Sequence, residues 1–197
     1  MKPALYLVSS LVVAAGLARA EPVTYQLDPT HTFVTFEALH RGLSTVRGRF
    51  DRKQGQVVLD REAKTGRVEV SFDTAAVSTG VAALDRRLQE PDFFASADHP
   101  QARFVADRVL FADGKPAEVT GELTLAGRTN PLTLKATGFN CYFNPLFKRE
   151  VCGGDFVAVV RRSQWGLNFG LPDLVPDEIR LLVQVEARLL TVTLRNA

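Results

Sequence analysis

The strongest constraint on the fold is an alternation of apolar and polar residues with a period of two. It is clearest in four runs, at 66–74, 118–126, 132–138 and 179–188. Successive side chains of a β-strand point to opposite faces, so each run predicts a strand with one buried face. Weaker versions of the pattern predict further strands at 23–28, 32–40, 43–51, 56–60, 102–111 and 156–163.

Turn-forming residues separate these runs at intervals typical of strands. Examples are Asp28-Pro29, Lys53-Gln54-Gly55, Asp113-Gly114 and Asn144-Pro145. Glycine, proline, asparagine and aspartate favour turns because of their backbone conformations and local hydrogen bonds. Strands joined by short turns indicate an all-β chain with an antiparallel sheet, which either closes into a barrel or folds into a sandwich.

One segment, residues 81–90, departs from this pattern. Leu84 and Leu88 are four positions apart, with charged residues around them, and Pro91 follows. This spacing predicts a short helix that ends before the proline. Phe93 and Phe94 come next and need burial. We therefore expect a helix that acts as a lid or plug near one end of the sheet.

The first 20 residues have the composition of a secretory signal peptide. Lys2 precedes an apolar run at 4–17, and Ala18-Arg19-Ala20 resembles a cleavage site. The apolar run is too short to span a bilayer, which takes about 20 residues. We expect export to the periplasm and a single domain over 21–197. Removal of Lys2 and Arg19 leaves 22 basic and 22 acidic residues, and this balance argues against nucleic-acid binding.

The chain has two cysteines, Cys141 and Cys152, 11 positions apart. In an exported protein such a pair predicts a disulfide. A metal site is a weaker alternative, because the three histidines are scattered along the sequence. His31 and His40 are predicted to point to opposite faces of one strand, and His99 lies in a loop. No metal site is therefore predicted.

Small residues occur on faces that are predicted to point inward, among them Gly48, Gly121, Ala136 and Gly138. An eight-stranded barrel has an interior that is either filled by side chains or able to hold one small ligand. The small residues leave room for a ligand, or the glycines only allow the strands to bend. The sequence leaves both explanations open.

No catalytic motif stands out. The sequence contains no G-x-S-x-G, H-E-x-x-H or C-x-x-C pattern. We therefore predict a protein that is not an enzyme and that needs no cofactor.

Several segments resemble the YceI-like proteins. They are Tyr25 to His40 and Gly42 to Phe50, Pro91-Asp92-Phe93-Phe94 with His99-Pro100 and Phe104, Val119 to Leu125 with Gly127, Leu132-Thr133-Leu134, and Arg162-Ser163-Gln164-Trp165-Gly166-Leu167. The resemblance covers nearly all of 21–197 in the same order. It implies an eight-stranded antiparallel, lipocalin-like barrel with a short helix, which holds a polyisoprenoid or a similar long amphiphilic lipid.

The resemblance implies a ligand site, and we predict which residues form it. The lining is predicted to include Val34, Phe36, Val46, Phe94, Phe104, Leu123, Leu134 and Trp165, with His40, Arg41 and Arg86 near the mouth. Plain core packing is the alternative for each aromatic residue. Many relatives carry Arg-Asp-x-His-Leu on the helix, where this chain has Leu84-Asp85-Arg86-Arg87-Leu88, so Arg86 or Arg87 is expected to replace the contact with the lipid head.

Two functions are consistent with the resemblance. The first is a periplasmic carrier of an isoprenoid lipid, such as a quinone or a polyprenyl phosphate. The second is a partner or regulatory module of a membrane cytochrome-type redox protein, in which any lipid is only structural. A homodimer is a further interaction that the sequence leaves open.

Overall fold

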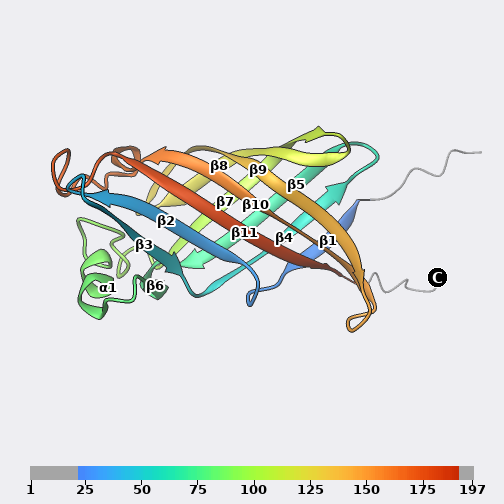
Figure 1. Cartoon of the computed structure of the whole chain (residues 1–197), viewed down its shortest axis with the longest axis horizontal. Helices are drawn as coiled ribbons and strands as arrows, with labels where there is room; N and C mark the ends of the chain where they lie inside the picture. The colour runs from blue at the N-terminus through green and yellow to red at the C-terminus, as the bar shows by residue number, and fades with distance from the viewer. Residues whose placement is uncertain (1–21, 191–197) are drawn as a thin grey trace, which may run out of the picture.

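The computed structural model describes residues 22–190, which form a barrel of long antiparallel strands (Figure 1). Within this part of the chain eight strands close the barrel, because β11 pairs back onto β1. In spatial order they are β1 (Val23–Leu27), β4 (Lys53–Asp60), β5 (Thr65–Asp73), β7 (Gln101–Ala112), β8 (Lys115–Leu125), β9 (Arg128–Asn144), β10 (Arg149–Arg161) and β11 (Glu178–Leu189). The predicted all-β, eight-stranded barrel is confirmed.

Three more strands extend the sheet at one end of the barrel: β2 (Phe33–His40), β3 (Ser44–Phe50) and β6 (Val77–Ser78). The first half of β11 pairs with β2, and its last residues pair with β1. The turn between β1 and β2 thus lets both strands share one edge of β11. As a result β1 closes one end of the barrel, while β2 and β3 form the wall at the other end.

The predicted helix is confirmed as α1 (Ala82–Leu88), at the left end of the barrel in Figure 1. The turn that follows it buries Phe94, which is 8% exposed. The ring of Phe94 contacts those of Phe36 and Phe50, with centroids 6.3 and 5.3 Å apart. These contacts hold the helical segment against β2 and β3.

Strands β9 and β10 are longer than predicted. Their outer halves carry few alternating apolar residues, so the pattern missed the hairpin that runs to Asn144 and resumes at Arg149. Cys141 and Cys152 lie directly opposite each other in this hairpin and form the predicted disulfide. Closing a loop of about 12 residues contributes roughly 3 kcal/mol in the chain-entropy model.

A bulge in this hairpin changes the predicted inward face of β9. The pairing shifts between Asp155 and Phe156, where Ala136 and Gly138 oppose them, so β9 carries an extra residue. The alternation therefore reverses: Phe139 lines the interior, and Gly138 is exposed. The prediction that Gly138 points inward was wrong.

The other two glycines do not leave empty space. A Cβ on Gly121 would lie 2.1 Å from the carbonyl oxygen of Val105, where β7 bulges. A Cβ on Gly48 would lie 2.3 Å from the ring of Phe36. Both positions need glycine because a neighbour approaches closely. The first supports the explanation from strand bending, and at the second an aromatic ring takes the room.

Between residues 22 and 190, no helix combines the length and the apolar character required to cross a membrane. The predicted signal peptide, residues 1–20, lies outside the described residues, and both its cleavage and the domain limits 21–197 stay predictions.

Candidate ligand-binding site

A cavity of about 540 Å³ occupies the barrel interior. All eight barrel strands, together with β2, β3 and α1, contribute residues to its lining, and nearly all of these side chains are apolar. Its volume falls within the range of about 300–1,000 Å³ that is typical of small-molecule sites. The cavity exists although Gly48 and Gly121 leave no gaps, because the barrel is wider than its inward side chains can fill.

The cavity lining includes residues from both ends of the barrel, and the two ends differ. At one end Tyr25, Leu59, Cys152 and Ala187 line it, and each is at most 5% exposed. The phenol of Tyr25 donates a hydrogen bond to Glu150, and burial together with this bond raises the pKa of Tyr25 to about 12. We call this the closed end.

At the other end the lining reaches the surface. We call this end the mouth and define it by the lining residues His40, Arg87, Phe93, Phe169 and Leu174. Phe169 is 43% exposed although it also lines the cavity. The mouth is bounded by the β2–β3 turn, by α1 with the turn after it, and by the β10–β11 loop. A backbone hydrogen bond from Arg41 to Leu174 joins the turn to the loop.

The structure brings most of the predicted ligand-contacting residues together. Nine of them line the cavity: Val34, Phe36, His40, Val46, Phe94, Phe104, Leu123, Leu134 and Trp165. Arg86 and Arg41 do not line it, and both side chains are exposed. Arg87, the neighbour of Arg86, takes the position at the mouth. Contact with a ligand stays a prediction for all of these residues.

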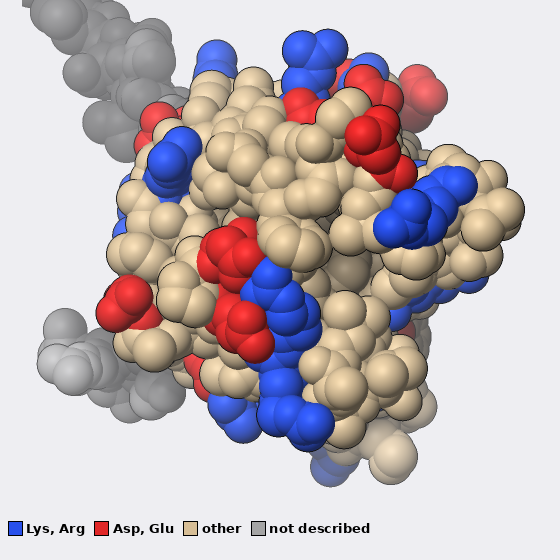
Figure 2. All heavy atoms as spheres, turned by 90° about the vertical axis from the view of Figure 1, so that its left-hand side faces the viewer, with Lys and Arg blue, Asp and Glu red and all other residues tan. Residues whose placement is uncertain are grey.

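Arg87 joins the helical segment to the β10–β11 loop at the mouth. Its guanidinium lies 4.5 Å from the ring centroids of both Phe93 and Phe169. It also forms ion pairs with Asp92 at 2.5 Å and Glu90 at 2.7 Å. The hydrogen bonds from Arg87 lower the pKa of Asp92 from its ordinary value. Figure 2 looks onto this end, where paired positive and negative side chains cross a largely uncharged surface.

The β10–β11 loop is organised by Arg162, which is 7% exposed. Its guanidinium donates hydrogen bonds to the backbone carbonyls of Leu167, Val175 and Pro176. Burial lowers the pKa of Arg162 from its ordinary value, and the charge of Asp177 opposes this shift. Sequence patterns did not predict the loop, because residues 166–177 have no regular period. The Arg-Ser-x-aromatic-Gly resemblance was the one signal of its importance.

The protein's single tryptophan lies at the base of this loop. Trp165 is 2% exposed, and its Nε1 donates a hydrogen bond of 2.9 Å to the carbonyl of Leu123. Trp165 also lines the cavity. Its fluorescence is therefore a natural reporter of cavity occupancy.

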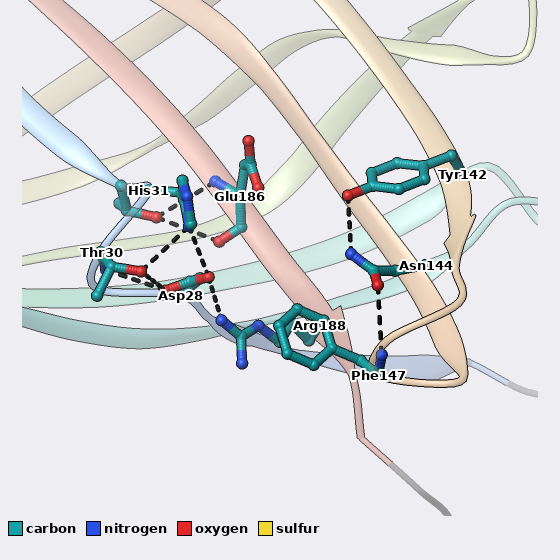
Figure 3. A network of polar contacts seen from close by, with 9 residues as sticks. Asp28, Thr30, His31, Tyr142, Asn144, Phe147, Glu186 and Arg188 are labelled. Atoms are coloured by element: carbon teal, nitrogen blue, oxygen red, sulfur yellow. Dashed lines mark hydrogen bonds and ion pairs between the residues drawn. The ribbon is translucent and has the colours of Figure 1, made fainter.

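A polar network lies at the β1–β2 turn, away from the mouth (Figure 3). Buried Asp28 accepts hydrogen bonds from Thr30, His31 and Arg188. Burial alone would raise the pKa of Asp28, but these hydrogen bonds outweigh it and hold the pKa well below its usual range. Asp28, His31 and Glu186 place their ligand atoms within 4.8 Å of one another. Arg188 already neutralises Asp28, so the group is better explained as an ion-pair network than as a metal site.

We expect His31 to titrate above its ordinary pKa. Its Nδ1 lies 2.9 Å from the Asp28 carboxylate, and this contact raises the pKa of the imidazole. The ion pair stabilises the fold fully below about pH 6.5, the pKa of an unperturbed histidine. That contribution is lost as the pH rises through the higher pKa of the folded state. Histidine titration by NMR measures the midpoint.

Asp28→Asn is expected to lower the His31 midpoint toward the ordinary value. Asp113→Asn, in the distant β7–β8 turn, serves as the matched control and should leave the midpoint unchanged. A His31 midpoint that is the same in all three proteins would contradict the coupling to Asp28.

Comparison with known proteins agrees with this architecture. The model of the YceI-like domain matches residues 25–187. Protein YceI of Escherichia coli O157:H7 is 36% identical over 129 residues, which cover 65% of this chain and 67% of the relative. The match thus spans about two thirds of the length of these curated relatives.

Two solved structures share the fold. BcnA of Burkholderia cenocepacia has a TM-score of 0.68 at 23% identity, over 82% of this chain and 99% of that one. A polyisoprenoid binding domain from Saccharophagus degradans, implicated in plant cell wall breakdown, has a TM-score of 0.61 at 16% identity, over 85% and 99%. Taken together, the family model, the 36% identical relative and the shared barrel show that this chain belongs to the YceI-like family.

Proposed function

We propose that the protein binds a long-chain isoprenoid lipid, a quinone or a polyprenyl phosphate, inside the barrel and carries it in the periplasm. The observation that carries the proposal is the cavity itself: its lining is apolar, includes residues from both ends of the barrel, is fully buried at one end and reaches the surface at the other. Each methylene group buried there contributes about 0.8 kcal/mol, so a chain-like guest gains affinity along its whole length. The structural similarity to a polyisoprenoid binding domain supports this choice of guest.

The polarity of the lining favours binding over catalysis. Among the described lining residues none is a carboxylate, and the two arginines already have partners: Arg162 holds backbone carbonyls and Arg87 pairs with Asp92. His40 and Arg87 lie at the mouth, beside the position that we propose for the lipid head. We therefore also propose that the protein is not an enzyme.

The predicted location is also a proposal. A disulfide such as Cys141–Cys152 forms and persists in oxidising compartments, which supports export. The alternative role as a partner of a membrane redox protein stays a prediction, as does a homodimer. A pull-down from membranes in the absence of lipid would test the first of these, and sedimentation would test the second.

Native mass spectrometry of protein extracted gently from cells is the test of the proposed function. We expect a bound species heavier than the polypeptide by the mass of an isoprenoid lipid. After its removal, adding a quinone or a polyprenyl phosphate should change the fluorescence of Trp165, which borders the cavity. A ligand-free protein whose Trp165 responds to neither compound would exclude this function. The relative affinities of the two compounds identify the preferred head.

A further inference from the structure

We propose that the mouth end of the barrel docks onto a lipid bilayer, with the β2–β3 turn inserted into it. This inference rests on the proposed function, because an isoprenoid lipid is dissolved in a membrane before a carrier takes it up. It assigns an interaction surface, which we call the rim patch and define as Leu39, Leu43 and Phe169, and it commits to one occupant, the bilayer surface.

The exposure of the rim patch is its first support. Leu43, at the tip of the β2–β3 turn, is 83% exposed, Leu39 is 44% exposed and Phe169 is 43% exposed. Large apolar side chains at such a tip gain free energy when they leave water. All three lie on the two elements that bound the mouth, the β2–β3 segment and the β10–β11 loop, at the left end of Figure 1.

The second support is continuity with the cavity. Phe169 is both a member of the rim patch and a lining residue. His40, which lines the cavity, lies between Leu39 and Arg41 on β2 and the turn after it. Phe169 therefore links the exposed apolar surface to the cavity at this end. With a bilayer apposed to this end, a guest would pass along Phe169 into the cavity without exposing its chain to water.

The charge around the rim patch does not select a kind of lipid head group. Arg41 and Arg86 are exposed, and neither forms an ion pair within residues 22–190. The nearby carboxylates keep negative charge: Asp85 accepts hydrogen bonds from neutral Thr79, while Glu90 and Asp92 share the single positive charge of Arg87.

Asp173, in the β10–β11 loop, adds another exposed carboxylate. Three arginines therefore face four carboxylates, so docking at this end rests on the apolar side chains and not on charge.

The opposite end of the barrel provides a matched control. The β9–β10 hairpin exposes Leu146 (79%), together with Tyr142, Phe143 and Phe147. This hairpin lies beyond the closed end, where Tyr25, Leu59 and the disulfide separate it from the cavity. A bilayer bound there could not pass a lipid into the mouth. The two ends can thus be distinguished with one substitution each, at side chains of the same type and nearly equal exposure.

The experiment is flotation of the protein with vesicles of phosphatidylcholine and phosphatidylglycerol, at a ratio of 3:1. We expect the unmodified protein to float with these vesicles, and to a similar extent with phosphatidylcholine alone. Leu43→Glu should lower the bound fraction at least tenfold, because a carboxylate replaces the inserted side chain. Leu43→Phe and Leu146→Glu should bind like the unmodified protein. Transfer of a labelled polyprenyl lipid between vesicles should follow the same order.

Binding of a short-chain quinone from solution, followed by the fluorescence of Trp165, separates this inference from the proposed function. If Leu43→Glu binds quinone and also floats like the unmodified protein, the rim patch is excluded as the docking surface. The proposed lipid-binding function is then unaffected. Loss of flotation in Leu146→Glu alone would place docking at the hairpin and overturn the inference. If the protein binds no vesicles but does bind quinone, the bilayer is excluded as the occupant of the rim patch. A protein that binds no isoprenoid would contradict the proposed function itself, and with it the docking inference.

Discussion

Arg162→Ala is expected to lower the free energy of unfolding by about 3 kcal/mol. The buried guanidinium donates to three backbone carbonyls of the β10–β11 loop, those of Leu167, Val175 and Pro176. Hydrogen bonds to charged groups contribute roughly 1.5–3 kcal/mol each, and unpaired carbonyls in a buried position add a desolvation cost. Rearrangement of the loop toward water recovers part of this loss. Chemical denaturation, followed by the fluorescence of Trp165, measures the change.

The neighbouring Arg161 provides the control. Its side chain is exposed, and Arg161→Ala is expected to change the stability by no more than about 0.5 kcal/mol. Arg162→Lys should recover only part of the loss, because an ammonium group lacks the planar fork that reaches several carbonyls at once. If Arg162→Ala and Arg161→Ala were equally stable, the loop would be held by something other than this guanidinium.

The loss at Arg162 should extend to ligand binding. The loop that it organises carries Phe169, Leu174 and Val175, which line the cavity at and near the mouth. We therefore expect a weaker affinity for an isoprenoid even under conditions in which Arg162→Ala is fully folded. A stable variant with unchanged affinity would show that the loop has no part in holding the guest.

Val34→Trp is expected to weaken the binding of an isoprenoid lipid about 50-fold. Val34 on β2 lies opposite Val183 on β11, and both line the cavity. An indole at this position occupies space that about three methylene groups of the guest would fill. At about 0.8 kcal/mol for each of these groups, the loss is roughly 2.4 kcal/mol. Equilibrium binding of a radiolabelled polyprenyl lipid measures it without relying on tryptophan fluorescence.

The matched control is Thr35→Trp, one residue further along the same strand. Because side chains alternate along a strand, Thr35 points away from the barrel interior, and its substitution should leave the affinity unchanged. Denaturation curves of both variants establish that they are folded. An unchanged affinity in Val34→Trp would mean that the guest does not occupy the cavity at this level.

The strands of the barrel could be predicted well from the sequence, because burial of one face imposes an alternation that is visible in the chain. Val68, Val70 and Phe72 on β5 are an example: all three line the cavity, as their period indicates. The helix at 82–88 was predicted for a similar local reason, the spacing of Leu84 and Leu88 before Pro91. The inward face of β9 was predicted only up to Ala136. A bulge depends on the pairing of two strands, so the alternation within one strand does not reveal it.

The candidate site also has a part that the sequence predicts and a part that it does not. Nine of the residues predicted to contact the guest line the cavity, because an inward position on a strand already follows from alternation and resemblance. The existence of the cavity could not be derived from them: small residues such as Gly48 and Gly121 suggested space that the structure fills with neighbouring groups. The void depends instead on the diameter of the closed barrel, which no local pattern encodes.

The mouth was decided by the tertiary structure alone. The helix carries two neighbouring arginines, Arg86 and Arg87. Only the contact with Phe169 of the β10–β11 loop shows that Arg87 joins the helical segment to this loop. That loop is irregular in sequence, and it is held by side-chain hydrogen bonds to backbone carbonyls far apart along the chain. Period and composition determine which residues face inward, because burial is a local property of a strand. Which residues meet across the barrel depends on closure of the sheet, and closure is a property of the whole chain.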